Sequence, residues 1–550
     1  MKGIEAFAKI LELEGTKQVF TFPDDPLATP CGDIGIKPFL AKTERGAIAM
    51  ADAYTRMKNG SEVGVCSVMG GGGIENSFTG IAQAWEDLVP ILLVTGGPST
   101  STAGLRGNRI DLEKCYGSVT KWVSSINYTS RIPEFLRIAF TYLRNGRRSP
   151  VVLEVPSDVG EGNFNEQKFN YRPVKSWRSS GDPRDIRIAV KALLAAENPL
   201  IYVGQGVFWA DACEELLKFA ELIQAPVITT LVGKSAFPET HPLSIGFIRG
   251  DPVIHFMEKA DLIFSIGSGL NQDTTMAPMI PKGKKVIQIV DSERDLNKGY
   301  NVEHAIMGDA KLVLIQLIEE TLKHSSVSRE NEELVVEIKE VEENWFKKLM
   351  PLATSDETPI NPYRVIWDLM NTLDPSNMIL THDAGSPRDQ TTTLYQAPIP
   401  HGFLGWGHVT SLGFSLPAIM GAQLAYPDRV CATIMGDASA PQASLYEFEA
   451  ALRHEIPVLG IVLNNSQYAG YEDIYPYTMH VTPSNVLNHS RVVEAMGVCS
   501  ERVECPDEIA PAIKRAEKEL RTGKPALIEV ITKPLPLYGG WGRRGLGYGG

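Results

Sequence analysis

Residues Gly436–Asn465 read GDASAPQASLYEFEAALRHEIPVLGIVLNN. The stretch leaves one strand at a glycine-aspartate turn, continues through a helix, and returns as a second apolar strand that ends in two asparagines. In an open α/β sheet, parallel strands joined by a helix end at the same edge, where ligands bind, so Asp437 and Asn465 are expected to lie close together. Hard oxygen ligands beside a glycine turn and a helix N-terminus suit a Mg²⁺ ion that holds a diphosphate. The stretch therefore predicts a magnesium and diphosphate site.

The bulk composition narrows the class of protein. A length of 550 residues predicts about three domains at roughly 100–200 residues each. The net charge of −13 argues against a nucleic-acid or anionic-membrane partner, because both need basic surfaces. The seven cysteines are odd in number and form no Cys-x-x-Cys pair, so we expect reduced thiols, mostly packed as small core residues. The N-terminus has no signal-peptide core and no apolar run is long enough to span a bilayer, which favours a soluble cytoplasmic protein.

Apolar runs of strand length alternate with helical segments along the whole chain, and examples are 63–69, 91–95, 151–155, 200–203, 262–266, 285–290, 378–381, 430–435 and 526–531. Such runs indicate parallel sheets that are covered on both faces. The predicted fold class is therefore α/β, with doubly wound domains and mainly parallel sheets.

Two polar breaks divide the chain, a strand-poor stretch at 163–183 and a charged run at 325–348 that is expected to be a linker helix. The predicted domains span 1–165, 184–325 and 355–535, followed by a glycine-rich tail at 536–550 that carries two arginines. The order of helix, apolar residue, proline and strand in 80–96 is echoed in 446–465, so the first and third domains are predicted to be divergent copies of one unit.

A second segment, TERGAIAMADAYTR at 43–56, makes a family resemblance specific when it is combined with Asp437 and Asn465. Together they resemble the glutamate helix and the GDG…NN signature of enzymes that use thiamine diphosphate (ThDP). Further segments match in order, namely VVLEVPSDV (151–159), YVGQGV (202–207), GKSAFPETHPLSIG (233–246) and SLGFSLPAIMGAQLAYP (411–427). The arrangement is most similar to the acetolactate synthase, benzoylformate decarboxylase and 2-hydroxyacyl-CoA lyase superfamily. The resemblance implies three domains. In chain order they would be a pyrimidine-binding domain, a Rossmann-like central domain and a diphosphate-binding domain.

The resemblance also implies the role of individual residues. Glu44 would be the catalytic carboxylic acid that hydrogen-bonds the pyrimidine ring of ThDP and favours its reactive tautomer. Asp437 and Asn465 would coordinate Mg²⁺ together with the backbone carbonyl of Gln467. Leu412 would support the cofactor from below with its bulk. The remaining predicted cofactor contacts are Gly385, Ser386, Thr410, Gly436, Ala438, Ser439 and Tyr468.

One position departs from the family pattern. Where the family has glycine after the metal-binding aspartate, this chain has Ala438, and alanine tolerates a positive φ poorly. Ser439 is expected to lie at the start of the helix that follows, and Gly385-Ser386 in THDAGSPRDQ to supply a second phosphate-binding loop.

The substrate contacts are less specific, and the candidates are Asp24, Asp25, Gln83, Asn108, Arg109, His408 and Tyr468. Asn108-Arg109 stands where acetolactate synthases have glutamine and glutamate, which suggests an acidic or phosphorylated substrate. His408 is a candidate proton shuttle because imidazole titrates near neutral pH.

The central domain carries a lone GQG after a strand, which is a weak dinucleotide signal. The family's FAD-binding run is replaced by GLNQDTTM at 269–276, so FAD is not expected, although it stays possible.

The resemblance implies a ThDP- and Mg²⁺-dependent carboligase or decarboxylase of a small-molecule 2-oxo acid, which works through ylide and enamine intermediates as a homodimer or homotetramer. Three alternatives stay open: a lyase or decarboxylase of a 2-hydroxyacyl-CoA or oxalyl-CoA substrate, with the tail as a lid; a catalytically silent scaffold homologue; and a nicotinamide oxidoreductase, which lacks a full GxGxxG.

Overall fold

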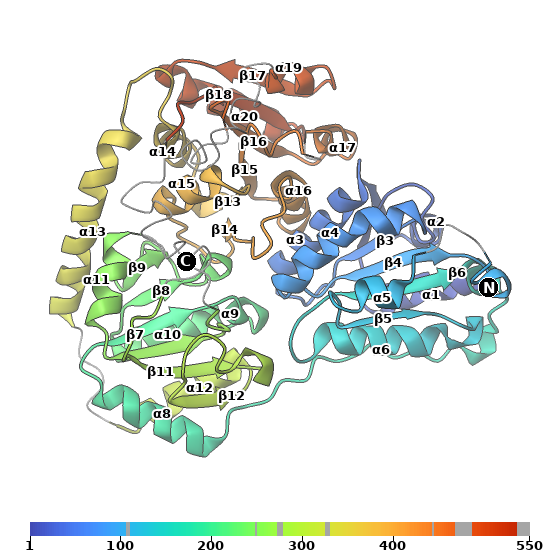
Figure 1. The fold of residues 1–550 in the computed structure, drawn as a ribbon, viewed down its shortest axis with the longest axis horizontal. Helices are drawn as coiled ribbons and strands as arrows, with labels where there is room; N and C mark the ends of the chain where they lie inside the picture. Colours follow the sequence, from blue (N-terminus) through green and yellow to red (C-terminus); the bar gives the residue numbers. More distant parts are fainter. Residues whose placement is uncertain are drawn as a thin grey trace.

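The computed structural model describes residues 1–105, 110–247, 250–271, 279–324, 331–442, 445–467 and 487–535 (Figure 1). Within these ranges the chain forms three six-stranded sheets, each flanked by helices. All the strand pairs in the sheets are parallel, as the long apolar runs predict. Strand β16 (Val458–Asn464), for example, is buried along its full length. The α/β class and the three-part arrangement are confirmed.

The N-terminal sheet has the strand order β2 (Lys37–Leu40), β1 (Gln18–Thr21), β3 (Val65–Val68), β4 (Leu92–Gly97), β6 (Val151–Pro156), β5 (Trp122–Ser125). Its helices are α1 (Gly3–Leu13), α2 (Ala28–Asp33), α3 (Glu44–Met57), α4 (Gly72–Glu86), α5 (Leu112–Tyr116), α6 (Ile132–Arg144) and α7 (Ser157–Glu161).

The central sheet has the order β12 (His304–Met307), β11 (Lys285–Val290), β10 (Leu262–Ile266), β7 (Pro199–Val203), β8 (Val227–Thr229), β9 (Ser244–Phe247). Its helices are α8 (Pro183–Ala195), α9 (Gly206–Trp209), α10 (Cys213–Ile223), α11 (Asp251–Lys259) and α12 (Ala310–Thr321).

The C-terminal sheet has the order β14 (Phe403–Leu404), β13 (Met378–His382), β15 (Val430–Gly436), β16, β18 (Ala526–Ile531), β17 (Cys499–Val503). Its helices are α14 (Pro362–Thr372), α15 (Ser386–Leu394), α16 (Ser415–Ala425), α17 (Glu447–Arg453), α19 (His489–Glu494) and α20 (Ile509–Arg521).

The first and third sheets share one topology. If the strands β1 to β6 are matched in chain order with β13 to β18, the two strand orders are identical. The sequence similarity between 80–96 and 446–465 is consistent with this match, because these two segments lead into β4 and β16, which are matched strands. The helices that follow β2 and β14, which are α3 and α16, are then equivalent elements of the two domains.

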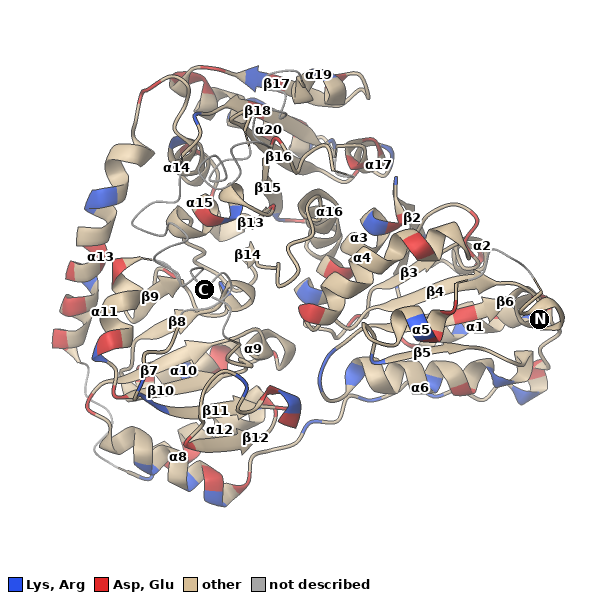
Figure 2. Cartoon of the chain, in the orientation of Figure 1, with Lys and Arg blue, Asp and Glu red and all other residues tan. Residues whose placement is uncertain are grey.

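Helices α3 and α16 pack directly against each other and join the two domains. Almost every residue of both helices is buried, and Figure 2 shows no charged residue on α16. The close contact depends on Gly421, because a Cβ atom at this position would lie 2.2 Å from the carbonyl oxygen of Met50. One apolar core therefore runs from the N-terminal sheet through both helices into the C-terminal sheet.

Two connections separate the three sheets. Residues 169–182 contain neither helix nor strand, and the charged run leads into α13 (Glu332–Ala353), which carries charges of both signs (Figure 2). The expectation that most cysteines lie in the core is wrong: Cys31, Cys66 and Cys431 are buried, but Cys115, Cys499 and Cys505 are exposed. Among the helices of the described ranges, none has the length and apolarity that a membrane span requires.

Candidate functional site

The two predicted metal ligands leave neighbouring strands at the same edge of the C-terminal sheet. Strands β15 and β16 pair with Gly436 opposite Leu463. Asp437 therefore directly follows β15 beside Asn464, the last residue of β16, and Asn465 comes next. Asp437 is partly exposed, and burial of its carboxyl raises its pKa to about 6. The side-chain oxygen of Asn465 accepts a hydrogen bond from the backbone N–H of Gln467 at 2.9 Å, which turns the chain at the strand end.

This donor set fits Mg²⁺. The site offers one carboxylate, one amide oxygen and backbone carbonyls, and Mg²⁺ commonly combines one or two carboxylates with phosphate oxygens and water. In the part of the chain that the structure describes, no group of three or more His, Cys, Asp or Glu side chains is arranged to hold a metal. A softer ion bound by several imidazole or thiolate ligands is therefore not indicated at the described residues.

A buried polar pair, His489 and Glu529, supports the turn at Asp437. One ring nitrogen of His489 lies 3.2 Å from the backbone oxygen of Asp437, and the other lies 2.9 Å from Oε1 of Glu529. The amide of Asn464 donates to the same Glu529 oxygen at 2.8 Å. Burial alone would raise the pKa of Glu529, but hydrogen bonds from His489 and Asn464 lower it to about 2. Both strand ends are thus tied to one carboxylate on β18.

The predicted phosphate loop after β13 has the geometry of an anion site. Gly385 is the N-cap of α15 with a φ of 87°, and a Cβ atom at this position would meet no other atom within 4 Å. Ser386 is the first residue of the helix, so backbone N–H groups of its first turn point towards the sheet edge. Pro387 lies close to Gly436, which places this helix start beside the turn that carries Asp437.

The turn after Asp437 differs from the prediction. The helix begins at Glu447 and not at Ser439. The hydroxyl of Ser439 instead bonds both the N–H and the carbonyl of Gly436 at 3.1 Å, and Pro441 restricts the residue before it, so the chain turns before a helix can start. Ala438 is not among the residues with a positive φ, so alanine fits here without strain.

Glu44 occupies the first position of α3. The hydroxyl of Thr43 caps this helix by accepting from the N–H of Gly46 at 2.9 Å. Glu44 is only 5% exposed, and its Oε2 accepts from the amide of Asn76 on α4 at 3.3 Å. The carboxyl of Glu447 from the C-terminal domain lies at the same helix start, where it accepts from the N–H of Lys42 at 3.0 Å.

Leu412 lies on the loop between β14 and α16, for which we use the name Leu412 loop, residues 405–413. Its side chain is partly exposed, and the neighbouring Val409 and Thr410 are exposed. Thr410 has a φ of 54°, a conformation that is strained for a β-branched residue. Val409, Thr410 and Leu412 of this loop thus reach the surface, whereas Trp406 is buried.

The substrate candidates are separated by the structure. Asp24 lines a cavity of about 330 Å³ at the carboxyl edge of the N-terminal sheet, together with Met69, Gly70, Thr95, Gly96 and Glu154. Asp25 instead accepts from the N–H groups of Leu27 and Ala28 at 2.8 Å, and burial raises its pKa.

Two candidates bind protein groups. Gln83 is fully buried, and it donates to Asp87 at 2.6 Å and accepts from the N–H of Ser411 at 3.3 Å, so it has no surface for a substrate. His408 places Nδ1 2.6 Å from Oδ1 of Asp87 and is 18% exposed. Asn108, Arg109, Tyr468 and the tail 536–550 lie outside the described residues.

Sequence reasoning missed Asp87 and Arg45, which connect the N-terminal and C-terminal domains beside the site, and Asp383, which fixes the C-terminal domain internally. Asp87 is the C-cap of α4, where the helix dipole disfavours a negative charge. An aspartate at such a position was the available signal for a cationic partner. The carboxylate of Asp383 accepts from the N–H groups of Ala384, Gly413 and Ser415 and thereby joins the end of β13 to the start of α16.

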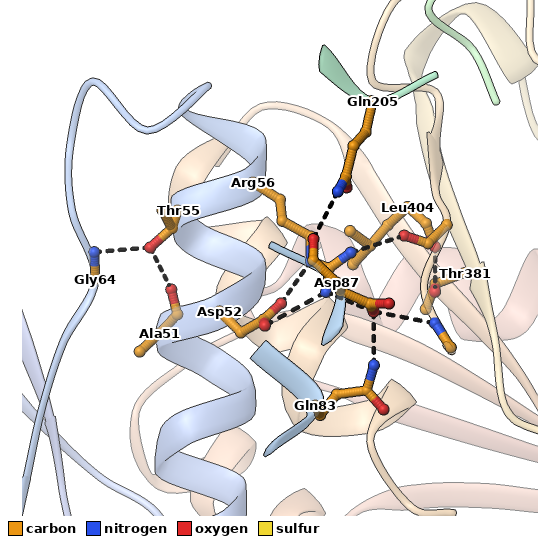
Figure 3. Close-up of polar contacts among 12 residues, drawn as sticks. Ala51, Asp52, Thr55, Arg56, Gly64, Gln83, Asp87, Gln205, Thr381 and Leu404 are labelled. Atoms are coloured by element: carbon orange, nitrogen blue, oxygen red, sulfur yellow. Dashed lines mark hydrogen bonds and ion pairs between the residues drawn. The ribbon is translucent and has the colours of Figure 1, made fainter. Parts of the chain in front are cut away.

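The GQG of the central domain has a packing role. Both glycines allow close packing against Gly267. A Cβ atom at Gly204 would lie 2.3 Å from the carbonyl oxygen of Gly267, and a Cβ atom at Gly206 would lie 2.6 Å from the Cα atom of Gly267. The side chain of Gln205 between them donates to the backbone oxygen of Asp87 at 2.7 Å, so the loop binds the N-terminal domain (Figure 3).

Comparison with known proteins agrees with this geometry. Residues 1–115, 186–317 and 383–530 match the N-terminal TPP binding domain, the central domain and the C-terminal TPP binding domain of thiamine pyrophosphate enzymes. A probable acetolactate synthase large subunit of Methanocaldococcus jannaschii is 30% identical over 99% of this chain and 94% of its own length. The acetolactate synthase isozyme 3 large subunit of Escherichia coli K12 is 28% identical, with coverage of 98% and 97%. Glyoxylate carboligase of Escherichia coli O157:H7 is 27% identical, with coverage of 96% and 93%.

Proposed function

The chain belongs to the thiamine pyrophosphate (ThDP) enzymes and acts on carbon–carbon bonds, and on that premise we propose that it is a Mg²⁺-dependent carboligase of 2-oxo acids. The observation that carries the proposal is the pairing of β15 with β16, which brings Asp437 and Asn465 to one edge beside the N-terminus of α15. The relatives named acetolactate synthase and glyoxylate carboligase support a 2-oxo acid as the substrate.

When ThDP is bound, its thiazolium supplies the electron sink that allows a carbon–carbon bond beside a carbonyl to break or form. The chain would bind and orient it. Asp437, Asn465 and the carbonyl of Gln467 would hold Mg²⁺, while the N–H groups after Gly385 would bind diphosphate oxygens. Glu44, which is almost fully buried, would hold or share a proton at the pyrimidine ring. Leu412 would fix the cofactor's shape by its bulk.

We propose further that the minimal assembly is a homodimer in which Glu44 of one subunit and Asp437 of another serve the same cofactor. Two inactive variants test this. If sites form between subunits, mixing Glu44→Ala with Asp437→Ala under conditions of subunit exchange regenerates one intact site in each mixed dimer, and activity returns. If each site lies within one chain, the mixture stays inactive.

The substrate is tested by incubating the protein with ThDP, Mg²⁺ and a panel of 2-oxo acids that includes pyruvate, 2-oxobutyrate and glyoxylate. Release of CO₂ together with a 2-hydroxy-3-oxo acid detected by mass spectrometry is the expected result. Turnover of a 2-hydroxyacyl-CoA or oxalyl-CoA, and not of the oxo acids, would replace the proposal with the acyl-CoA alternative. A protein that gains no thermal stability from ThDP with Mg²⁺ would be a silent homologue.

A further inference from the structure

The backbone of the Leu412 loop is held by side chains of the N-terminal domain. Oδ2 of Asp87 accepts from the N–H of Gly407, and Oδ1 accepts from the N–H of His408, both at 3.0 Å. Gln83 accepts from the N–H of Ser411 at 3.3 Å. Two backbone oxygens are bound as well. Arg56 donates to Gly405 at 3.1 Å, and Arg45 donates to Leu412 at 2.6 Å.

Gln83, Arg56 and Asp87 form a connected, buried cluster together with Asp52, and Arg45 lies outside it. Arg56 lies between the carboxylates of Asp52, at 2.6 Å, and Asp87, at 2.8 Å, and all three residues are at most 6% exposed (Figure 3). Gln83 donates to the same oxygen of Asp87 at 2.6 Å. Burial alone would raise the pKa of Asp87, but Arg56 and His408 lower it well below its ordinary value, so the carboxylate that binds the loop is ionised. A buried ionic cluster of this kind fixes geometry, because each member loses its partners if it moves.

The loop needs such support because its conformation is unfavourable by itself. Thr410 has a φ of 54°, and a left-handed β-branched residue persists only where surrounding contacts determine the backbone. Apart from the contact between the His408 ring and Asp87, these hydrogen bonds reach the loop through its backbone groups. The side chains of Val409, Thr410 and Leu412 remain at least partly exposed. The loop is therefore fixed by its backbone, and the side chains of Val409, Thr410 and Leu412 stay accessible to a ligand.

We propose that Arg45, Gln83, Arg56 and Asp87 are positioning residues that hold Leu412 in the place from which it shapes the bound cofactor. The inference rests on the proposed ThDP function. The N-terminal domain then has a second role besides that of Glu44, which is to position the Leu412 loop. Arg45 does so through its hydrogen bond to the backbone oxygen of Leu412.

Arg45 gives the sharpest test, because its guanidinium makes one described hydrogen bond and its side chain is only partly buried. Arg45→Met keeps the apolar stem and removes the donor, and Arg45→Lys restores a donor. We expect Arg45→Met to raise the Kd of ThDP, titrated calorimetrically at saturating Mg²⁺, about 10-fold, as for one hydrogen bond from a charged donor. At saturating ThDP, kcat should fall while the substrate KM stays unchanged, and Arg45→Lys should recover most of the affinity.

A double-mutant cycle separates positioning from general stability. If Arg45 acts through Leu412, then Arg45→Met has no further effect on the Kd of ThDP in a Leu412→Ala background. Arg147→Met is the matched control, because Arg147 pairs with Asp295 at 3.3 Å at another contact between domains, and it should leave the Kd unchanged. Gln83→Leu, which removes the acceptor for Ser411, provides a second variant and should weaken ThDP binding in the same direction.

An unchanged Kd in soluble, folded Arg45→Met or Gln83→Leu overturns the inference, and so do additive effects in the cycle. Both results leave the proposed function intact, since the wild-type protein still binds ThDP. Failure of the wild-type protein to bind ThDP with Mg²⁺ would instead overturn the proposed function.

Discussion

The carboxyl of Glu447 accepts a hydrogen bond from the backbone N–H of Lys42 at 3.0 Å, which places a buried acid of the C-terminal domain at the start of the helix that carries Glu44. Burial raises the pKa of Glu447 from 4.5 to about 7. The folded protein therefore holds a proton here that the unfolded chain releases above pH 4.5, and stability falls as the pH rises from 4.5 to 7.

The first prediction concerns this pH dependence. Glu447→Gln keeps an acceptor for Lys42 and has no charge to bury, so its melting temperature should fall less than that of the wild type between pH 5 and pH 7. By pH 8 the free energy of unfolding of the wild type should have fallen at most about 3 kcal/mol further than that of Glu447→Gln. Glu449→Gln on the same helix is the control, because Arg453 helps to lower the pKa of Glu449 to about 2, and this variant should keep the wild-type slope. If the melting temperatures of the wild type and Glu447→Gln changed with pH in parallel, the raised pKa of Glu447 would be contradicted.

The second prediction separates chemistry from cofactor binding. Glu44→Gln should reduce kcat by about 10²- to 10⁴-fold, the range for loss of a positioned acid or base. The affinity for ThDP with Mg²⁺, measured by calorimetry, should change far less, because the proposed diphosphate ligands lie in the other domain. Glu134→Gln, which also alters a carboxylate in the first turn of a helix, should leave both quantities unchanged. Full turnover by Glu44→Gln would remove Glu44 from the reaction.

The third prediction concerns the metal site. The wild-type protein should melt at a higher temperature with ThDP and Mg²⁺ present, since a ligand at 100 times its Kd adds about 2.7 kcal/mol of stability. Asp437→Ala should abolish this rise, because the only carboxylate among the proposed Mg²⁺ ligands is lost. Asp507→Ala, at an exposed position in the same domain, serves as the comparison and should retain the rise. A full ligand-induced shift in Asp437→Ala would show that Mg²⁺ binds elsewhere.

The strands and the position of Asp437 and Asn465 at one sheet edge were predictable because their signals are local. A buried parallel strand such as β16 is apolar along nearly all of its length. Asp437 and Asn465, the proposed oxygen ligands, directly follow the strand ends at Gly436 and Asn464. The identical strand order of the first and third sheets also agrees with a repeat visible in the sequence.

The support of the Leu412 loop was not predictable, because its partners are far apart in the chain. Asp87 and His408 are 321 positions apart, and Arg45 and Leu412 are 367 apart, so no spacing rule connects them. The start of α17 was misplaced for a local reason: the small residues after Asp437 are compatible with a helix, but the hydroxyl of Ser439 and the ring of Pro441 favour a turn.

The fourth prediction concerns a buried ion pair between the central and C-terminal domains. Lys234 and Glu239 are 2.5 Å apart and almost fully buried, and they bind the backbone of Tyr395 and Ala397 respectively. Glu239→Gln should destabilise the protein by about 3–5 kcal/mol, because it leaves an uncompensated buried ammonium. The double variant Lys234→Met with Glu239→Leu should recover much of that loss in chemical denaturation. A double variant less stable than Glu239→Gln would show that the pair itself stabilises the contact.

The fifth prediction uses backbone strain in the Leu412 loop. Thr410 and Gly413 both have a positive φ, of 54° and 84°. Thr410→Gly relieves the steric cost of a left-handed β-branched residue, about 1–2 kcal/mol, and adds about 0.5–1 kcal/mol of unfolded-state entropy, so stability should stay equal or rise. Gly413→Ala introduces the same cost and should destabilise the protein by about 1 kcal/mol or more. If the contacts of Asp87 and Arg45 determine the loop, Thr410→Gly should also leave the Kd of ThDP within about twofold of wild type, because the backbone then keeps its shape without help from the threonine. A large loss of affinity in Thr410→Gly would instead place the Thr410 side chain in direct contact with the cofactor.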